Sequence, residues 1–93
     1  LSVQSAAGTT TGKTTVTVTP EKGGSSAYFY KTGANVELPA YNDVCNINNG
    51  WTSWDGSSEI TAKTGDKIVV VEVTQDESYA RKAGQATVTA KDE

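Results

Sequence analysis

The feature that most constrains the fold is a period-two alternation of β-branched residues, repeated between closely spaced glycines. Over residues 13–19 valines alternate with threonines, so Val16 and Val18 fall on one face of a strand and the intervening threonines on the other. Nine glycines interrupt the chain, and no glycine-free stretch carries apolar residues at helical spacing. The sequence therefore predicts an all-β chain.

Segments of this kind recur along the whole sequence, separated by turn signals. We expect strands over residues 2–6, 13–19, 27–31, 35–38, 51–54, 59–62, 67–74 and 85–90. Turns are predicted at 23–24, 31–33, 49–50, 55–56, 65–66 and 83–84. About seven short strands at this spacing indicate an immunoglobulin-like β-sandwich.

Segment 67–74 is the richest in apolar residues. They stand at both odd and even positions and so fall on both faces of a strand, which is typical of a central strand with apolar neighbours on both sides. A chain of 93 residues supplies one domain, residues 1–93, with one core. We expect that core to contain Val16, Val18, Trp54, Ile68, Val70 and Val88.

Charge and hydropathy exclude two classes of partner. The net charge is −3 and the eight Lys and Arg residues are scattered, whereas phosphate binding needs them clustered. The longest apolar run, residues 68–71, is far shorter than the roughly 20 residues of a membrane span. We therefore expect neither a nucleic acid nor a membrane as partner.

The single cysteine, Cys45, excludes an intrachain disulfide. Its asparagine-rich surroundings lack the His or Cys partners of a zinc site. We expect Cys45 to be a passive, partly buried thiol that serine can replace without loss of folding.

The chain contains few residues that could act in catalysis. The chain has no histidine, so serine and cysteine nucleophiles lack their usual base. Asp43 and the pair Asp76-Glu77 could serve acid–base catalysis, or Asp43 with Asn42 and Asn46 could hold calcium. No segment matches a calcium loop, however, and acidic pairs in strand connections are usually solvated. We expect no catalytic, cofactor-binding or metal-binding residues.

Residues 7–14 fit a relaxed phosphate-loop pattern, Ala-Gly-Thr-Thr-Thr-Gly-Lys-Thr. Such a loop must open a helix whose N-terminal amides face the phosphates. Here the alternating strand 13–19 follows instead, so the pattern predicts a turn.

Four aromatic residues could form a platform for sugar stacking: Tyr41, Trp51, Trp54 and Tyr79. On one regular strand Trp51 and Trp54 point to opposite faces. We expect Trp54 in the core and Trp51, beside the Asn49-Gly50 turn, to be exposed. Trp51, Tyr41 and Tyr79 are then the candidate surface contacts.

Several longer motifs resemble one family. They are Gly12-Lys13-Thr14 with 16–18, Tyr28-Phe29-Tyr30-Lys31-Thr32-Gly33, Trp54-Asp55-Gly56-Ser57 with 60–62, residues 64–73, and 80–84. Together they resemble an Ig-like module of virion proteins from tailed phages of Gram-positive hosts. The resemblance spans Gly8 to Ala90 and implies a surface-exposed sandwich without enzymatic activity.

Three functional hypotheses follow. The leading one is a display module on a phage virion, as capsid decoration or fibre, with a capsid or other virion protein as partner and weak adhesion to host cell-surface polysaccharide. The alternative is an extracellular adhesin or carbohydrate-binding module on the bacterial cell surface. A small hydrolase is disfavoured by the missing histidine.

Overall fold

The chain folds as a two-layer β-sandwich in a computed structural model that describes residues 2–19, 26–34, 36–45, 48, 50–56, 58–75 and 78–91. The strands are β1 (Ser2–Ala7), β2 (Lys13–Thr19), β3 (Ser26–Gly33), β4 (Thr52–Trp54), β5 (Ile60–Thr61), β6 (Lys67–Thr74) and β7 (Ala80–Thr87). All strand pairs are antiparallel. The described residues contain no helix, so the all-β prediction is confirmed.

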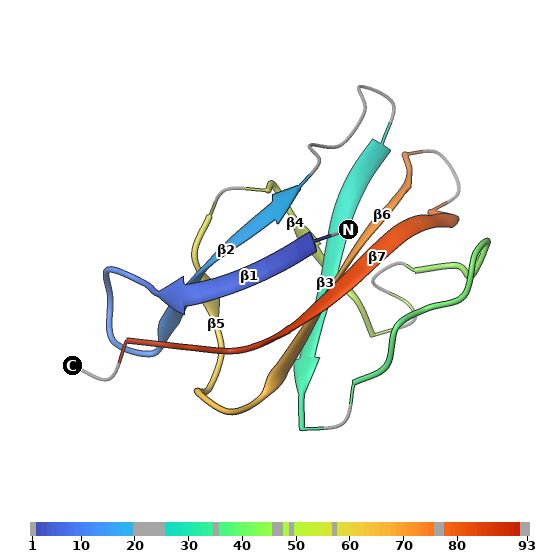
Figure 1. The fold of residues 1–93 in the computed structure, drawn as a ribbon. Helices are drawn as coiled ribbons and strands as arrows, with labels where there is room; N and C mark the ends of the chain where they lie inside the picture. Colours follow the sequence, from blue (N-terminus) through green and yellow to red (C-terminus); the bar gives the residue numbers. More distant parts are fainter. Residues whose placement is uncertain are drawn as a thin grey trace.

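The strand order is that of an immunoglobulin-like sandwich. Sheet A has the order β1-β2-β5, and sheet B has the order β4-β3-β6-β7. These orders match strands A-B-E and C′-C-F-G of the immunoglobulin fold. In Figure 1 the strands β1 and β2 of sheet A lie across β3, β6 and β7 of sheet B.

The core between the sheets contains the predicted residues. It is formed by Val16, Tyr28, Trp54, Ile60, Ile68, Val70, Val88 and Ala90, with Val18 partly buried against it. Alternation explains this set, because inward valines on β2 alternate with exposed threonines. The predicted facing of these segments is confirmed.

Strand β6 is buried on both faces, as its two-sided apolar pattern predicts. Val69, Val71 and Val73 point away from sheet A and belong to a second cluster with Cys45, Trp51 and Ala80. The prediction of one core was therefore incomplete. The chain following β3 folds back over the outer face of sheet B, and a period-two pattern cannot reveal which distant segment covers a sheet.

The distinctive segment after β4 is a structural turn. The indole N–H of Trp54 donates to the carbonyl of Ser58 at 2.8 Å, and the Asp55 carboxylate accepts from the Ser58 amide at 2.7 Å. Gly56 has φ +91°, and a side chain there would meet the Tyr28 ring at 3.2 Å. The motif thus keeps Trp54 against Tyr28, with ring centroids 5.5 Å apart.

The phosphate-loop pattern forms the β1–β2 hairpin, as expected from the strand that follows it. The amide and hydroxyl of Thr9 donate to the Glu59 carboxylate at 2.6–3.0 Å. These hydrogen bonds hold the pKa of Glu59 below its ordinary value. Lys13 donates through Nζ to the Thr61 hydroxyl at 2.6 Å, so the loop's polar groups connect β2 to β5.

Several strand-boundary predictions were wrong. The turn predicted at 31–33 lies inside β3, and the strand predicted at 85–90 is the end of β7, which begins at Ala80 and ends at Thr87. The described residues 36–38 are not in a strand, and the next residue, Pro39, cannot donate to a ladder. Ala83-Gly84 is not a turn, because Gly84 is buried inside β7 opposite Val70. Here glycine sits on the inner face of a strand that β1 contacts, where a side chain would occupy the space between the sheets.

One polar group in the sandwich lacks a partner. Glu72 lies on the inner face of β6, is 5% exposed, and its buried Oε1 makes no hydrogen bond to any described residue. An unsatisfied buried acceptor costs stability. The inner core must therefore offset this cost by its packing.

Because Val70 is fully buried between the sheets, its truncation should leave a cavity. We expect Val70→Ala to lower the free energy of unfolding by about 1–3 kcal/mol in chemical denaturation. Thr17→Ala, on the exposed face of sheet A, is the matched control and should change it by less than about 0.5 kcal/mol. Equal effects at the two sites would contradict the facing assignment.

Candidate contact surface

The structure separates the three predicted contact residues. Tyr41 is 69% exposed, Tyr79 is partly buried, and Trp51 is only 7% exposed. The expected exposure of Trp51 was wrong. Trp51 and Trp54 do point to opposite faces of sheet B, as predicted, but both faces are covered.

Trp51 lies under the chain that crosses the outer face of sheet B. The Lys31 ammonium lies 4.6 Å from the centroid of its ring, at a distance typical of a cation–π contact. Cys45, 1% exposed, belongs to the same cluster. Trp51 therefore acts in packing, and Tyr41 and Tyr79 remain as the candidate surface contacts.

Residues 36–45, which we call the crossing loop, run beside the edge strand β7 and are pinned to it. The amide of Asn42 donates to the carbonyl of Ala80 at 2.9 Å, and the amide of Ala80 donates to the carbonyl of Asp43 at 2.7 Å. The Cys45 amide donates to the Ser78 carbonyl at 2.9 Å. These bonds extend sheet B by a short antiparallel bridge, Val44 to Tyr79.

A β-bulge in β7 supplies the main side-chain anchor of the crossing loop. Lys82 pairs with Glu72 and Ala80 pairs with Val73, so Arg81 is the extra residue. Its guanidinium carbon lies 4.9 Å from the Tyr41 ring centroid and 5.9 Å from that of Tyr79. It also donates a hydrogen bond to the side-chain carbonyl of Asn42. Arg81 thus joins the exposed Tyr41 to the half-buried Tyr79.

The oxygen atoms proposed as calcium ligands serve the crossing loop itself. The Asp43 carboxylate accepts from the Ala40 amide at 2.8 Å, and the Asn42 carbonyl accepts from Arg81. Asn46 and the pair Asp76-Glu77 lie outside the described residues. No group of three potential metal ligands occurs in the part of the chain that is described.

The crossing loop is also where large apolar side chains reach solvent. Leu38 is 53% exposed, Val44 41% and Tyr41 69%. We call these three residues the apolar patch. Exposed apolar residues gathered in this way mark interaction surfaces more often than single ones do.

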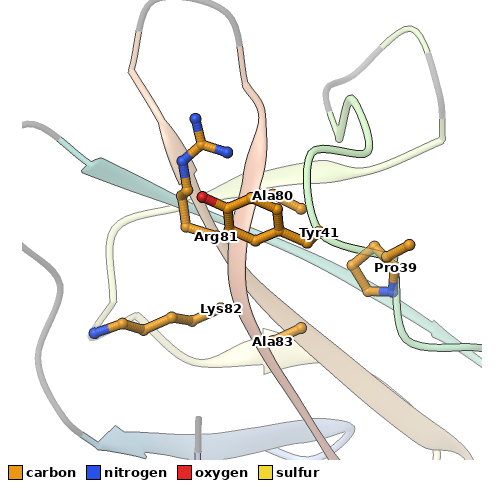
Figure 2. A pocket seen from close by; sticks show the side chains of 7 residues that line it. Pro39, Tyr41, Ala80, Arg81, Lys82 and Ala83 are labelled. Atoms are coloured by element: carbon orange, nitrogen blue, oxygen red, sulfur yellow. The ribbon is translucent and has the colours of Figure 1, made fainter.

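Two hollows flank Pro39, which lines both. The smaller, about 70 Å³, lies between Pro39 and Tyr41 on one side and residues 80–83 of β7 on the other (Figure 2). The larger, about 400 Å³, is lined by Lys31, Glu37, Leu38, Pro39, Asp43, Val44, Cys45 and Trp51. The surface therefore combines apolar side chains with charges of both signs.

Sequence reasoning missed Leu38, Val44 and Arg81. Leu38 lay in a predicted strand, where it would have had a regular facing. Arg81 belonged to a segment that ended in a predicted turn. The pair Leu38-Pro39 could have indicated this, because proline disfavours a paired strand. Outside a strand, alternation no longer predicts whether the Leu38 side chain is buried.

A comparison with known families adds an independent finding. The profile of the family described as S-layer protein SbsC C-terminal domain matches residues 6–90. The chain belongs to this family. No curated protein and no solved structure gives a match.

Membership of the SbsC C-terminal domain family helps to decide between a bacterial cell surface and a phage virion as the location of this domain. It agrees with the bacterial cell-surface alternative, and it gives no support to the tailed-phage resemblance. The described residues hold no helix long and apolar enough to cross a membrane. For this SbsC-type domain the apolar patch and Arg81 form the candidate contact surface.

Arg81 should determine how firmly the crossing loop is held. We expect Arg81→Ala to speed amide hydrogen exchange at Asn42 and Cys45 about tenfold, since it removes two ring contacts and a charged hydrogen bond. Lys82→Ala, one residue along the strand, should leave these rates unchanged. Global loss of protection in β6 would show instead that Arg81 supports the whole fold.

Burial raises the pKa of the Cys45 thiol, and the nearby Asp43 charge raises it further. The fold thus favours the neutral thiol, so this stabilisation is complete below the unfolded pKa near 9.0 and is lost as pH rises through the folded pKa. We expect the stability difference between the native chain and Cys45→Ala to shrink above about pH 9. A constant difference in denaturation midpoints across this range would contradict the prediction.

Proposed function

We propose that this domain is a non-enzymatic structural module of a bacterial cell-surface protein. The observation that carries the proposal is the family match over residues 6–90, which covers nearly the whole sandwich. A module of this kind acts through its shape and its surface, and it needs no reacting group.

The geometry of the polar side chains supports a structural role. Glu59 accepts hydrogen bonds from the β1–β2 hairpin, Asp55 closes the turn after β4, and Asp43 closes the crossing loop. Each of these carboxylates is engaged in shaping the backbone. An acid–base pair would require two carboxylates directed at a common substrate position.

Sheet A supplies a second, polar surface. Its outer face presents Thr15, Thr17 and Thr19 of β2, all exposed, opposite exposed residues of β1. The two faces of the sandwich therefore differ, with a hydroxyl-rich face on sheet A and the apolar patch over sheet B. Such a difference suits a module that meets solvent on one side and a neighbour on the other.

That residues 1–93 form one autonomous domain remains a prediction. We also retain as a prediction that the module does not require a nucleic acid or a membrane. Polysaccharide adhesion, the narrower form of the cell-surface alternative, is not needed to explain the contact surface, because Trp51 is buried and covered by Lys31.

The proposed setting can be tested by surface labelling. Antibodies raised against the chain should label intact cells of the source bacterium, and brief protease treatment of those cells should abolish the label. Purified virions released from the same culture are the matched comparison. Label confined to virions would overturn the proposal in favour of phage display, and label reached only after cell lysis would overturn both.

A further inference from the structure

Residues 88–91, which we call the anchor segment, are held more firmly than their place beyond the last strand would predict. They follow β7 and lie in no strand, yet the amide of each of the four donates a hydrogen bond. The side chains of Val88 and Ala90 are buried in the core between the sheets. The anchor segment is therefore attached through both its backbone and its side chains.

One side of the anchor segment is bonded to sheet A. The amide of Thr89 donates to the Ser5 hydroxyl at 2.9 Å, and the amide of Lys91 donates to the carbonyl of Lys13 at 3.0 Å. The carbonyl of Lys91 accepts from the Gly12 amide at 2.9 Å. These bonds join the anchor segment to β1 and to the hairpin that follows it.

The other side is bonded to the turn between β5 and β6. The amide of Val88 donates to the carbonyl of Asp66 at 2.7 Å. The amide of Ala90 donates to the Thr64 hydroxyl at 2.9 Å, and this hydroxyl donates to the Ala90 carbonyl at 3.3 Å. The anchor segment thus lies between the edge of sheet A and this turn, and it is bonded to both.

Ser5 is the centre of a chain of hydroxyl groups. Its Oγ lies 2.5 Å from Oγ1 of Thr14, a fully buried residue whose hydroxyl donates to the Ala6 carbonyl at 2.9 Å. Ser5 therefore donates to Thr14 while it accepts from the Thr89 amide. Hydrogen bonds in such a chain polarise and strengthen one another. The chain connects the anchor segment, β1 and β2.

The anchor segment runs parallel to β1. Thr89 is bonded to Ser5 within β1, and Lys91 is bonded to the hairpin beyond the end of β1. In Figure 1 the anchor segment continues past the arrowhead of β1, whereas the amino terminus is marked at the start of that strand. A pull on the two ends of the chain therefore slides the anchor segment and β1 past each other.

Sliding is the direction in which such an arrangement is strongest. Hydrogen bonds between neighbouring strands are perpendicular to the strands, so tension along the strands acts on all of them at once. Tension across the strands opens the same bonds one pair at a time. Forced unfolding is governed by the unfolding rate, which depends on this barrier.

We propose that β1 and the anchor segment form a mechanical clamp, so that the domain bears tension transmitted along the chain. Ser5 and the backbone of Lys91 resist sliding directly, and Thr64 keeps the anchor segment in place beside β1. This role goes beyond that of a structural module, because a module can occupy a surface without carrying tension. It also does not depend on the cell-surface setting.

The first experiment compares two directions of pulling on single molecules in optical tweezers. In one, handles are attached at the two termini; in the other, they are attached at the amino terminus and through an unnatural side chain at the exposed position Thr19. Ser2 pairs with Thr19, so the second geometry peels β1 from β2 pair by pair. We expect unfolding at the same force to be at least about tenfold slower in the terminal geometry.

The second experiment removes one arm of the clamp. Thr64→Val deletes the hydroxyl that bonds to Ala90 and keeps the size of the side chain. It should speed unfolding about tenfold at a given force in the terminal geometry and leave the peeling geometry unchanged. Thr52→Val, at an exposed threonine of β4, is the matched control and should alter neither rate.

A second variant tests the other arm. Ser5→Ala removes the centre of the hydroxyl chain and should also speed unfolding in the terminal geometry. Ser53→Ala, at an exposed serine of β4, is its control and should leave the rate as it is.

Three results would overturn the clamp. They are equal unfolding rates in the two geometries, a terminal geometry that neither Thr64→Val nor Ser5→Ala affects, and an effect of Thr64→Val that is the same in both geometries. The last would make Thr64 a residue of general stability only. Surface labelling of cells would be unaffected by any of these outcomes, so the two proposals fail separately.

Discussion

The structure depends on the burial of β6 on both faces. Ile68 and Val70 face sheet A, while Val69 and Val71 face the crossing loop, and all four are fully buried. Both hydrophobic clusters therefore share one strand. The sandwich needs no disulfide to join its layers, because β6 packs against sheet A with one face and against the crossing loop with the other.

The contact surface follows from that same arrangement. Since Val69, Val71 and Val73 would be exposed on an uncovered sheet B, the crossing loop must lie over them. The loop can bury only one side of itself, and its outward side carries Leu38, Tyr41 and Val44. The crossing loop thus buries the outer valines of β6 but exposes apolar side chains of its own.

Much of the fold could be predicted from alternation alone. The facing of Val16, Val18, Ile68 and Val70 required only the two-residue period and turn positions, which are local properties. The burial of Trp51 could not be predicted, because it depends on contact with a loop whose course is set by distant hydrogen bonds. The role of Arg81 was hidden for a related reason, since a bulge appears only when two strands are placed in register.

The bulge at Arg81 has a consequence for how the family can vary in length. Because Arg81 is the one unpaired residue between Ala80 and Lys82, its deletion would remove the loop's anchor and leave every neighbour on its present face. Deletion of any other residue within β7 would exchange the faces of the residues beyond it. A single-residue deletion in this strand is therefore tolerable at Arg81, where it would weaken the attachment of the crossing loop while preserving the sandwich.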